Sequence, residues 1–321
     1  MKRHAIIFAL IFIGAALFAV KQLEFSFAGT IARMFGQTSY ELKVTDPVLG
    51  VMSLLEFPLS STVVGLKAAL EKHTNRGMPW AVRTSFYTNL GDPSNVMKDS
   101  DWFLYQDYPP IYFSYTESDT EMRYLQATVR FDARLYSRRW FAVYGTGGYR
   151  FQYVDYDIMG YEGWQYVDTD LDDEYELYVI SASPILKVME YEITHHAPMA
   201  GIALSITTPN LAVDLAAGYQ LVFISDYDDH VLRSKLSTAE GIGHGLLCSL
   251  EGRYTLKRRI GVFRPFMFLA ADFSYIYADI VQTQEWYGNL DSVPKGTRYT
   301  GISHLIKSAL FTSTLGFGLH Y

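Results

Sequence analysis

The sequence has little that could crosslink the chain or anchor it by a helix. It contains one cysteine in 321 residues, which excludes an internal disulfide, and Cys248 shares strand parity with Leu246 and Leu250, which predicts apolar packing. After the N-terminus no run approaches the roughly 18 consecutive apolar residues of a transmembrane helix. The formal net charge is -7, so the basic surface that nucleic-acid binding requires is missing.

The one long apolar run lies at the N-terminus and has the organisation of a secretory signal. The basic residues 2–4 precede the apolar residues 5–20, and Ser-Phe-Ala at 26–28 fits the small-x-small pattern of a cleavage site. We therefore predict a signal peptide over residues 1–28 and one mature barrel domain over 29–321. An uncleaved membrane anchor is the alternative, although the run is short for a membrane span.

Aromatic residues are abundant, with 25 Tyr and 20 Phe, and they fall in alternating patterns. Over residues 211–230 one parity is apolar from Leu211 to Phe223, and the other includes Asp214, Gln220 and Asp226. Because a strand turns successive side chains to opposite faces, this pattern predicts an apolar face toward lipid and a polar face inside a barrel. Similar alternation recurs over 124–135, 263–277 and 311–321.

The alternating segments predict ten strands, separated by short turns and by longer polar links near 91–111, 157–176, 226–237 and 286–302. The expected strands are 31–44, 51–70, 80–90, 111–135, 139–156, part of 178–207, 211–226, 238–256, 262–285 and 303–321. The fold class is therefore all-β: a ten-stranded antiparallel transmembrane β-barrel whose strands project above the outer membrane, with both termini periplasmic. A soluble β-sandwich or lipocalin-like barrel is the alternative, but it would place its apolar residues inside.

Two polar segments carry acidic residues at a spacing of two: Asp99 with Asp101, and Asp226 with Asp228 and His230. In an extended backbone this spacing puts the side chains on one face. Histidine is a suitable base near neutral pH, and an adjacent carboxylate fixes its tautomer. Two carboxylates facing a His–Asp couple could hold and activate a water molecule, whereas solvated surface charge is the alternative interpretation.

Four segments resemble the omptins, a family of ten-stranded outer-membrane endopeptidases. They are Val-Met-Ser-Leu-Leu-Glu-Phe at 51–57, an Asp-x-Asp-Trp motif at 99–102, a Tyr-x₆-Pro-x-x-Gly pattern at 191–201 and an Asp-x-Asp-x-His motif at 226–230. Two further omptin runs are largely lost, at 112–120 and 147–153. The chain therefore resembles a divergent member of the family.

The resemblance assigns catalytic roles to four residues. Asp99 and Asp101 take the place of the catalytic aspartate pair, and Asp228 and His230 take the place of the Asp–His couple. The implied mechanism is direct attack by water, without an acyl-enzyme. In it His230, oriented by Asp228, takes the proton of the water, while Asp99, assisted by Asp101, holds the water against the scissile carbonyl.

The resemblance also implies substrate, partners and location. Asp226 and, more loosely, Glu41 would bind an Arg or Lys beside the scissile bond, so the expected substrate is a polypeptide with basic residues. No metal or organic cofactor is implied, although omptins need lipopolysaccharide, which joins outer-membrane lipid as an expected partner. The expected location is the outer membrane, with the active site at the extracellular face.

Other interpretations stay open. Residues His195 and His196 could suggest a metal site, but neighbours on a strand face opposite ways. The acidic segment 168–174 resembles a calcium loop without the glycine at its sixth position, and solvated charge is the simpler interpretation. Two rivals to a protease are a non-proteolytic omptin-like barrel, acting as adhesin, receptor or structural protein, and a small-solute channel.

Overall fold

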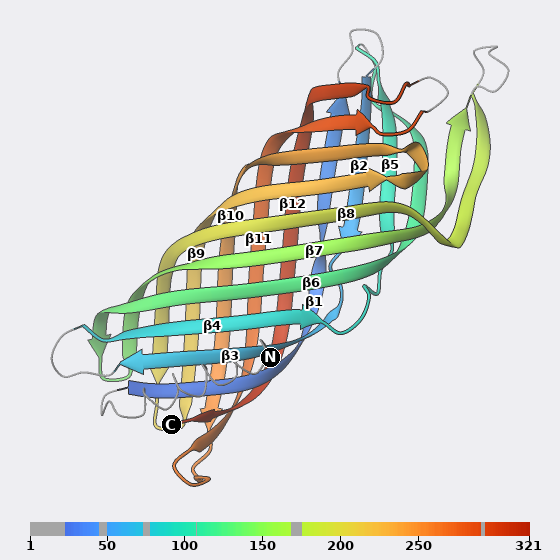
Figure 1. Cartoon of the computed structure of the whole chain (residues 1–321). Coiled ribbons are helices and arrows are strands. Elements are labelled where there is room, and N and C mark those ends of the chain that lie inside the picture. The colour runs from blue at the N-terminus through green and yellow to red at the C-terminus, as the bar shows by residue number, and fades with distance from the viewer. Residues whose placement is uncertain (1–22, 45–49, 73–77, 107, 168–174, 290–292) are drawn as a thin grey trace, which may run out of the picture.

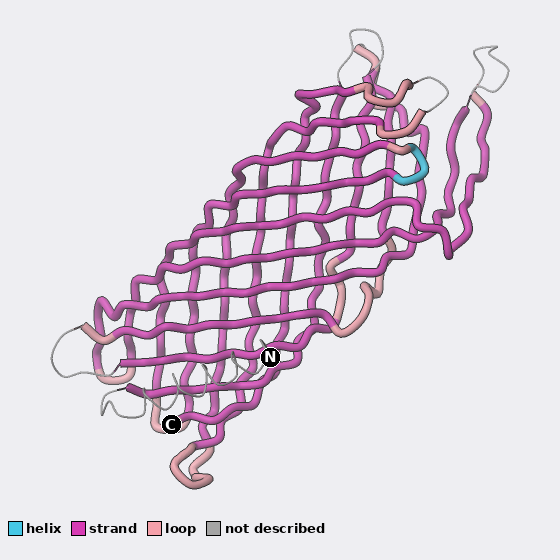
Figure 2. The backbone as a smooth tube through the Cα atoms, viewed as in Figure 1, coloured by secondary structure: helices cyan, strands magenta, loops and turns pink. Residues whose placement is uncertain are grey.

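The structure is a computed structural model that describes all residues except 1–22, 45–49, 73–77, 107, 168–174 and 290–292. The described residues form twelve antiparallel strands that wind into one closed barrel (Figures 1 and 2). A 3₁₀ turn, η1 (Val231–Arg233), joins β9 to β10. The strands are β1 (Leu23–Val44), β2 (Gly50–Pro58), β3 (Thr62–Lys72), β4 (Trp80–Asn89), β5 (Met97–Leu104), β6 (Ile111–Arg138), β7 (Phe141–Val167), β8 (Glu176–Thr207), β9 (Leu211–His230), β10 (Lys235–Thr255), β11 (Arg264–Trp286) and β12 (Arg298–His320).

These twelve strands occupy ten positions around the barrel. β1 pairs with β12 and so closes the ring. On its other side β1 pairs with β3 and then with β2, while β6 pairs with β4 and then with β5. β2 and β5 thus continue the wall beyond β3 and β4, toward the upper end in Figure 1. The prediction of a ten-stranded antiparallel barrel is confirmed.

Several predicted boundaries are wrong. The expected strand 51–70 is two strands separated by residues 59–61, and the link expected near 91–111 contains β5. The link expected over 157–176 is strand at both ends, because β7 reaches Val167 and β8 begins at Glu176, while residues 168–174 lie outside the described residues. Polar residues such as Lys98, Ser100 and Asp157 on these strands gave the pattern of a loop, although the same residues suit strands that extend beyond the hydrocarbon of the bilayer.

Outward side chains divide the barrel wall into two zones. Along β9 they include the exposed apolar Leu211, Leu215, Tyr219 and Phe223, and then Ser225, Tyr227 and Asp229. β3 and β4 are 11 and 10 residues long, which matches the ~9–11 residues that a tilted strand needs to cross a bilayer. The level of β3 and β4 therefore fits hydrocarbon, and β2, β5 and the upper ends of the longer strands project beyond it.

Among the described residues there is no helix long and apolar enough to cross a membrane.

The interior at the level of β3 and β4 is polar, as the alternation predicts. Lys67 pairs with Glu251 at 3.0 Å, and Arg83 pairs with Asp132 at 2.9 Å. Lys67, Glu251, Arg83 and Arg150 line a cavity of about 190 Å³. The Lys67–Glu251 pair ties β3 to β10 across the lumen, whereas the Arg83–Asp132 pair joins the neighbouring strands β4 and β6.

Above this cavity the interior is apolar, contrary to the sequence-based expectation of a polar inner face throughout. Four fully buried rings lie here and contact one another: Tyr40, Phe57, Tyr156 and Tyr191. We call them the aromatic floor, because the site described below lies on them. Their burial closes the lumen at this level, which disfavours the small-solute channel.

β1 bends at Gly36, where its partner changes from β3 to β2. Its φ is +148°, and the amide of Leu59 donates to the Gly36 carbonyl at 2.9 Å. A Cβ at this position would lie 2.0 Å from the backbone oxygen of Ala309 on β12. Only glycine fits such a close approach of two strands.

We therefore expect Gly36→Ala to lower the free energy of unfolding by about 1–3 kcal/mol, the usual cost of a forced backbone conformation. Denaturant unfolding of the purified barrel, followed by tryptophan fluorescence, measures this. Gly29→Ala on the same strand is the matched control, because a Cβ there meets nothing within 4 Å. Equal losses in the two variants would contradict the argument.

The start of β1 bears on the predicted signal peptide. β1 begins at Leu23, and residues 23–28 pair with 67–72 of β3. A cut after Ala28 would remove these pairs, whereas a cut upstream of Leu23 would keep them. Residues 1–22 and the acidic segment 168–174 lie outside the described residues, so the signal peptide and the solvation of that segment stay predictions.

Both chain ends of the barrel lie at the same end, opposite the site. The amide of Tyr321 donates to the carbonyl of Phe25 at 2.9 Å, so the last residue lies beside the start of β1. The connections at the other end include η1 between β9 and β10. This arrangement agrees with an even number of wall positions.

Candidate active site

β9 carries one half of the site on its inner face. Val222, Ile224, Asp226 and Asp228 are buried at alternate positions, and His230 follows at the mouth. The Asp228 side chain is 1% exposed and that of His230 15%. The even-numbered residues of β9 therefore face inward, as predicted, and the two acids follow the apolar Val222 and Ile224 along the strand.

The Asp228 carboxylate holds His230 in place. Nε2 of His230 lies 3.1 Å from Oδ2 of Asp228, and the hydroxyl of Tyr40 donates to the same oxygen at 2.5 Å. Tyr40 belongs to the aromatic floor and reaches Asp228 across the lumen from β1. The imidazole is therefore oriented by a carboxylate that is itself fixed by a phenol. Its Nδ1 has no hydrogen-bond partner among the described residues.

β5 carries the other half of the site. Asp99 pairs in register with Leu55, and Asp101 with Ser53; since Leu55 is buried in the lumen, both aspartates point inward. The Ser53 hydroxyl donates to Oδ1 of Asp99 at 3.3 Å. The spacing of two does put both carboxylates on one face, as predicted, although the segment is a strand and not a loop.

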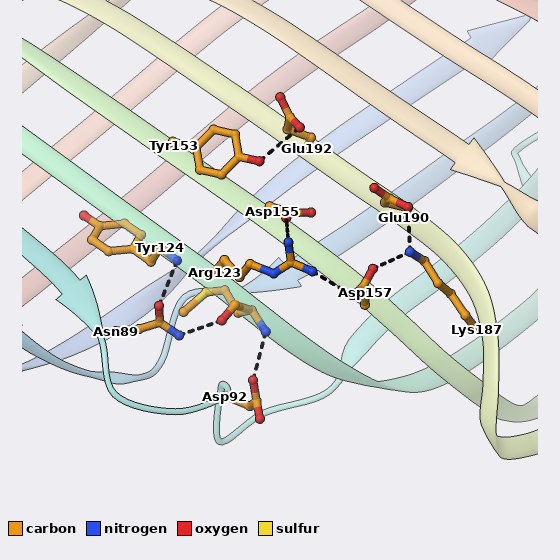
Figure 3. Close-up of polar contacts among 11 residues, drawn as sticks. Asn89, Asp92, Arg123, Tyr124, Tyr153, Asp155, Asp157, Lys187, Glu190 and Glu192 are labelled. Carbon is orange, nitrogen blue, oxygen red and sulfur yellow. Dashed lines mark hydrogen bonds and ion pairs between the residues drawn. The ribbon is translucent and has the colours of Figure 1, made fainter. Parts of the chain in front are cut away.

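Two side chains anchor the start of β5 to β6. Residues 119–124 of β6 have no described strand partner on this side, because β4 ends and β5 begins there. Asn89 fills the gap by accepting from the amide of Tyr124 at 2.8 Å, and Asp92 accepts from the amide of Met122 at 3.0 Å (Figure 3). These side chains replace the missing backbone hydrogen bonds between strands, and so they set the position along β6 at which β5 and its two aspartates begin.

Burial and mutual repulsion raise the pKa of the aspartate pair. The pKa of Asp99 rises from 3.8 to about 7, because the carboxyl is desolvated and Asp101 lies beside it. Burial also raises the pKa of Asp101, against the opposing effects of Ser53 and Arg233. Because the pKa of Asp99 lies at about 7, this carboxyl holds a proton in a large share of the molecules near neutral pH.

The Asp228–His230 couple, unlike the aspartate pair, holds no acidic proton near neutral pH. Burial lowers the pKa of His230 below 6.5, and Lys235 lowers it further, while Asp228 opposes both. Burial would raise the pKa of Asp228, but His230, Lys235 and the hydrogen bond from Tyr40 lower it. Near neutral pH the histidine is therefore neutral and its carboxylate ionised, which is the state of a general base.

The two halves act on one another across the mouth. The charge of Asp228 raises the pKa of Asp99, and His230 lowers that of Asp101. All four side chains point into the barrel interior above the aromatic floor. The structure thus gathers the four residues predicted to be catalytic into one group of inward side chains, called the cleft below.

Lys235 belongs to the same cleft and was not predicted. It pairs in register with His230 and is 8% exposed. Burial lowers the pKa of its ammonium, while Asp228, Asp99 and Asp101 oppose that effect. Its strand position, directly across the β9–β10 connection from His230, was a signal that sequence reasoning could have used.

Asp226 lies inside the barrel, as predicted, but it already has a partner. Oδ2 of Asp226 lies 2.8 Å from Nε2 of His304 on β12, and the two side chains are 1% and 0% exposed. His304 was not predicted either. Its alternation with Ile306 and Ser308 on the inner face of β12 would have marked it as an inward residue.

Glu41 is not part of the site, and this expectation needs correction. Its neighbours Tyr40 and Leu42 on β1 are buried inside the barrel, so Glu41 points to the outside. It pairs in register with Leu54 and Leu305. A difference of one residue reverses the face of a strand, and the residue that reaches the site from β1 is Tyr40.

The outer wall at this height is polar, in agreement with a site above the hydrocarbon. Arg123 pairs with Asp155 at 3.2 Å and with Asp157 at 3.3 Å, and Lys187 connects Asp157 to Glu190 (Figure 3). These groups lie on β6, β7 and β8. Such a network needs water on its outer side and does not suit contact with lipid tails.

A metal site gains no support from the residues that the structure describes. They contain no group of three or more His, Cys, Asp or Glu side chains arranged to hold a metal ion. His195 is buried, whereas His196 is exposed. The two histidines therefore face opposite ways, as the strand parity predicts.

Comparisons with known proteins concern the fold. No description of a known protein family and no curated protein matches the sequence. Among solved structures, the chain is similar to the outer membrane protease OmpT from Escherichia coli, with a TM-score of 0.76 and 11% identity over 93% of this chain and 97% of that one. The chain has an omptin-like fold. It also aligns with the outer membrane protein OprG from Pseudomonas aeruginosa, at a TM-score of 0.33 and 12% identity over 94% and 97% of the two chains, a likeness that supports no argument.

At 11% identity the omptin-like fold is all that the first comparison shows. The chemistry of the site therefore depends on its own geometry. That geometry consists of a carboxylate-oriented histidine, two carboxyls with raised pKa, a buried lysine and a closed floor.

Proposed function

We propose that this omptin-like barrel is an outer-membrane endopeptidase that hydrolyses peptide bonds with an activated water. The observation that carries the proposal is the placement of a carboxylate-oriented histidine on β9 and of two inward aspartates on β5 above one aromatic floor. His230, held by Asp228 at 3.1 Å, is neutral, while the Asp99–Asp101 pair retains a proton near pH 7. A base beside a proton donor is what hydrolysis of an unactivated amide requires.

In the proposed reaction, a water molecule lies between the two halves. Nδ1 of His230 takes its proton while the water oxygen attacks the scissile carbonyl carbon, and Asp228 stabilises the resulting imidazolium. Asp101 accepts a hydrogen bond from the same water, and protonated Asp99 donates to the carbonyl oxygen as it gains charge. The imidazolium then protonates the leaving amine, the C–N bond breaks, and the histidine returns to its neutral form.

The surroundings of the cleft support this chemistry. The aromatic floor is fully buried below the couple, and the His230 side chain is 15% exposed, so a polypeptide would approach the site from the end of the barrel above the membrane. Outer-membrane lipid surrounds the apolar outer face at the level of β3 and β4. We include lipopolysaccharide as a required lipid partner because of the omptin resemblance. The polypeptide partner is addressed below, since the pocket differs from the one expected.

Cleavage of peptides by the purified protein tests the proposal. The protein, folded in detergent with lipopolysaccharide, is incubated with a mixture of peptides of diverse sequence, and new termini are identified by mass spectrometry. We expect cleavage that a metal chelator and a serine-acylating reagent leave unchanged, because the mechanism uses neither a metal nor an acyl-enzyme. Absence of any wild-type cleavage would favour the rival, a non-proteolytic barrel that acts as adhesin, receptor or structural protein.

A further inference from the structure

The carboxylate expected to bind a basic substrate side chain is occupied from within. Asp226 and His304 contact each other at 2.8 Å, with side chains 1% and 0% exposed. The Tyr40 ring packs against His304 with centroids 5.0 Å apart and against Tyr191 at 5.3 Å. A guanidinium or ammonium group cannot reach Asp226 unless these buried rings move.

The space beneath the catalytic couple is also closed. Tyr40, Phe57 and Tyr191 have no solvent exposure, and the hydroxyl of Tyr40 is bound to Asp228. The long side chain of Arg or Lys needs a deep pocket with an acid at its end. Among the described residues, the space beneath the couple is filled by these rings and not by a pocket for such a side chain.

The charges of the cleft also disfavour a basic substrate side chain. Lys235 places an ammonium near Asp228, Asp99 and Asp101, and Arg233 in η1 acts on both members of the aspartate pair. These two cations supply the positive charge that a basic substrate would otherwise bring. Glu41, the second acid expected in the pocket, faces outward.

We propose that the Asp226–His304 pair, covered by Tyr40, fills the place of a basic-residue pocket, so that the site accepts small uncharged residues beside the scissile bond and does not select Arg or Lys. This inference rests on the proposed peptidase function for its consequence in catalysis. The state of the pocket itself can be measured without any cleavage. His304 then determines which substrate side chains the site accepts, although in the proposed reaction it contacts neither the attacking water nor the scissile bond.

The test combines binding and cleavage in full-length protein. Agmatine, which carries the guanidinium of an arginine side chain, is titrated into the folded barrel by calorimetry. In parallel, kcat/KM is compared for two peptides that differ only in Ala or Arg beside the bond. The variants are His304→Ala, which frees Asp226; His304→Gln, which keeps a hydrogen-bond donor; and His320→Ala, a control at the far end of β12. His304→Ser replaces His304→Ala if the latter does not give the electrophoretic mobility of a folded barrel.

We expect wild type, His304→Gln and His320→Ala to bind no measurable agmatine and to show no preference for the Arg peptide. His304→Ala should bind agmatine and shift the Arg-to-Ala ratio of kcat/KM by roughly tenfold to hundredfold, as for one new hydrogen bond to a buried charge. Agmatine binding or strong Arg preference in wild type would overturn the inference. If no peptide is cleaved but agmatine binds only after His304→Ala, the peptidase proposal fails and the occupied pocket stands.

Discussion

Replacing His230 with alanine is expected to lower kcat/KM for peptide cleavage by about 10²- to 10⁴-fold, the usual contribution of a general base. The loss should appear in kcat, with KM little changed, because the imidazole acts on the water and not on peptide binding. Initial rates near pH 7, on a peptide that wild type cleaves, measure the effect. The barrel should remain folded, because Asp228 keeps its hydrogen bond from Tyr40.

His196→Ala is the matched control, since this histidine lies on the outer face of β8 and contacts Tyr149; it should cleave at the wild-type rate. The couple should also behave as a unit. Adding Asp228→Asn to His230→Ala is expected to cause little further loss of kcat, because Asp228 acts through the histidine. A His230→Ala protein with more than about a tenth of wild-type activity would contradict the assigned role.

Replacing Asp99 with asparagine is expected to change the pH profile as well as the rate. Wild-type activity requires a neutral His230, whose pKa lies below 6.5, and a proton on the aspartate pair, where the pKa of Asp99 is about 7. The profile of kcat/KM should therefore have an acid limb below pH 6.5 and an alkaline limb near pH 7. An amide donates hydrogen bonds at every pH, so the alkaline limb should move to higher pH in Asp99→Asn. The maximal rate should fall roughly tenfold to hundredfold, because the acidic proton of Asp99 is lost. An unchanged alkaline limb would exclude Asp99 as its origin.

The same substitution should stabilise the protein at high pH. The pKa of Asp99 is raised from 3.8 to about 7 on folding, so the folded state binds the proton more tightly than the unfolded chain. Its contribution to stability is complete below pH 3.8, declines as the pH rises, and is lost above about pH 7. Asp99→Asn removes this dependence, so its advantage in free energy of unfolding should grow between pH 4 and 7 and then stay constant.

Denaturant unfolding of wild type and Asp99→Asn at several pH values measures this difference. Asp119→Asn, on the exposed surface of β6, is the control and should follow the wild-type curve. An Asp99→Asn variant that is less stable than wild type at about pH 8 would contradict the prediction, because other contacts would then stabilise the buried carboxylate. An Asp99→Asn protein that is more stable but less active than wild type would show that burial of this carboxyl lowers stability and supports activity.

Strand alternation alone determined the architecture of this protein and the faces of most site residues. Period-two patterns are local, so the inward direction of Asp99, Asp101, Asp226, Asp228 and His230 follows from sequence once each segment is taken as extended. The ten wall positions also followed, although β2 and β3 share one and β4 and β5 another. The breaks could not be predicted, because they depend on Gly36 meeting β12 and on side chains of residues 89–92 meeting β6.

Only the tertiary structure decided what each inward residue meets. Barrel closure brings β1 beside β12 and across from β9, so Tyr40 reaches Asp228 and His304 reaches Asp226, contacts between residues 188 and 78 positions apart. Glu41 shows the limit of pattern matching, because one step along the strand reverses the face. The sequence therefore determined which groups enter the lumen. The shear and closure of the barrel determined that Asp228 meets His230 and Tyr40 whereas Asp226 meets His304, because those pairings are set by the register of distant strands.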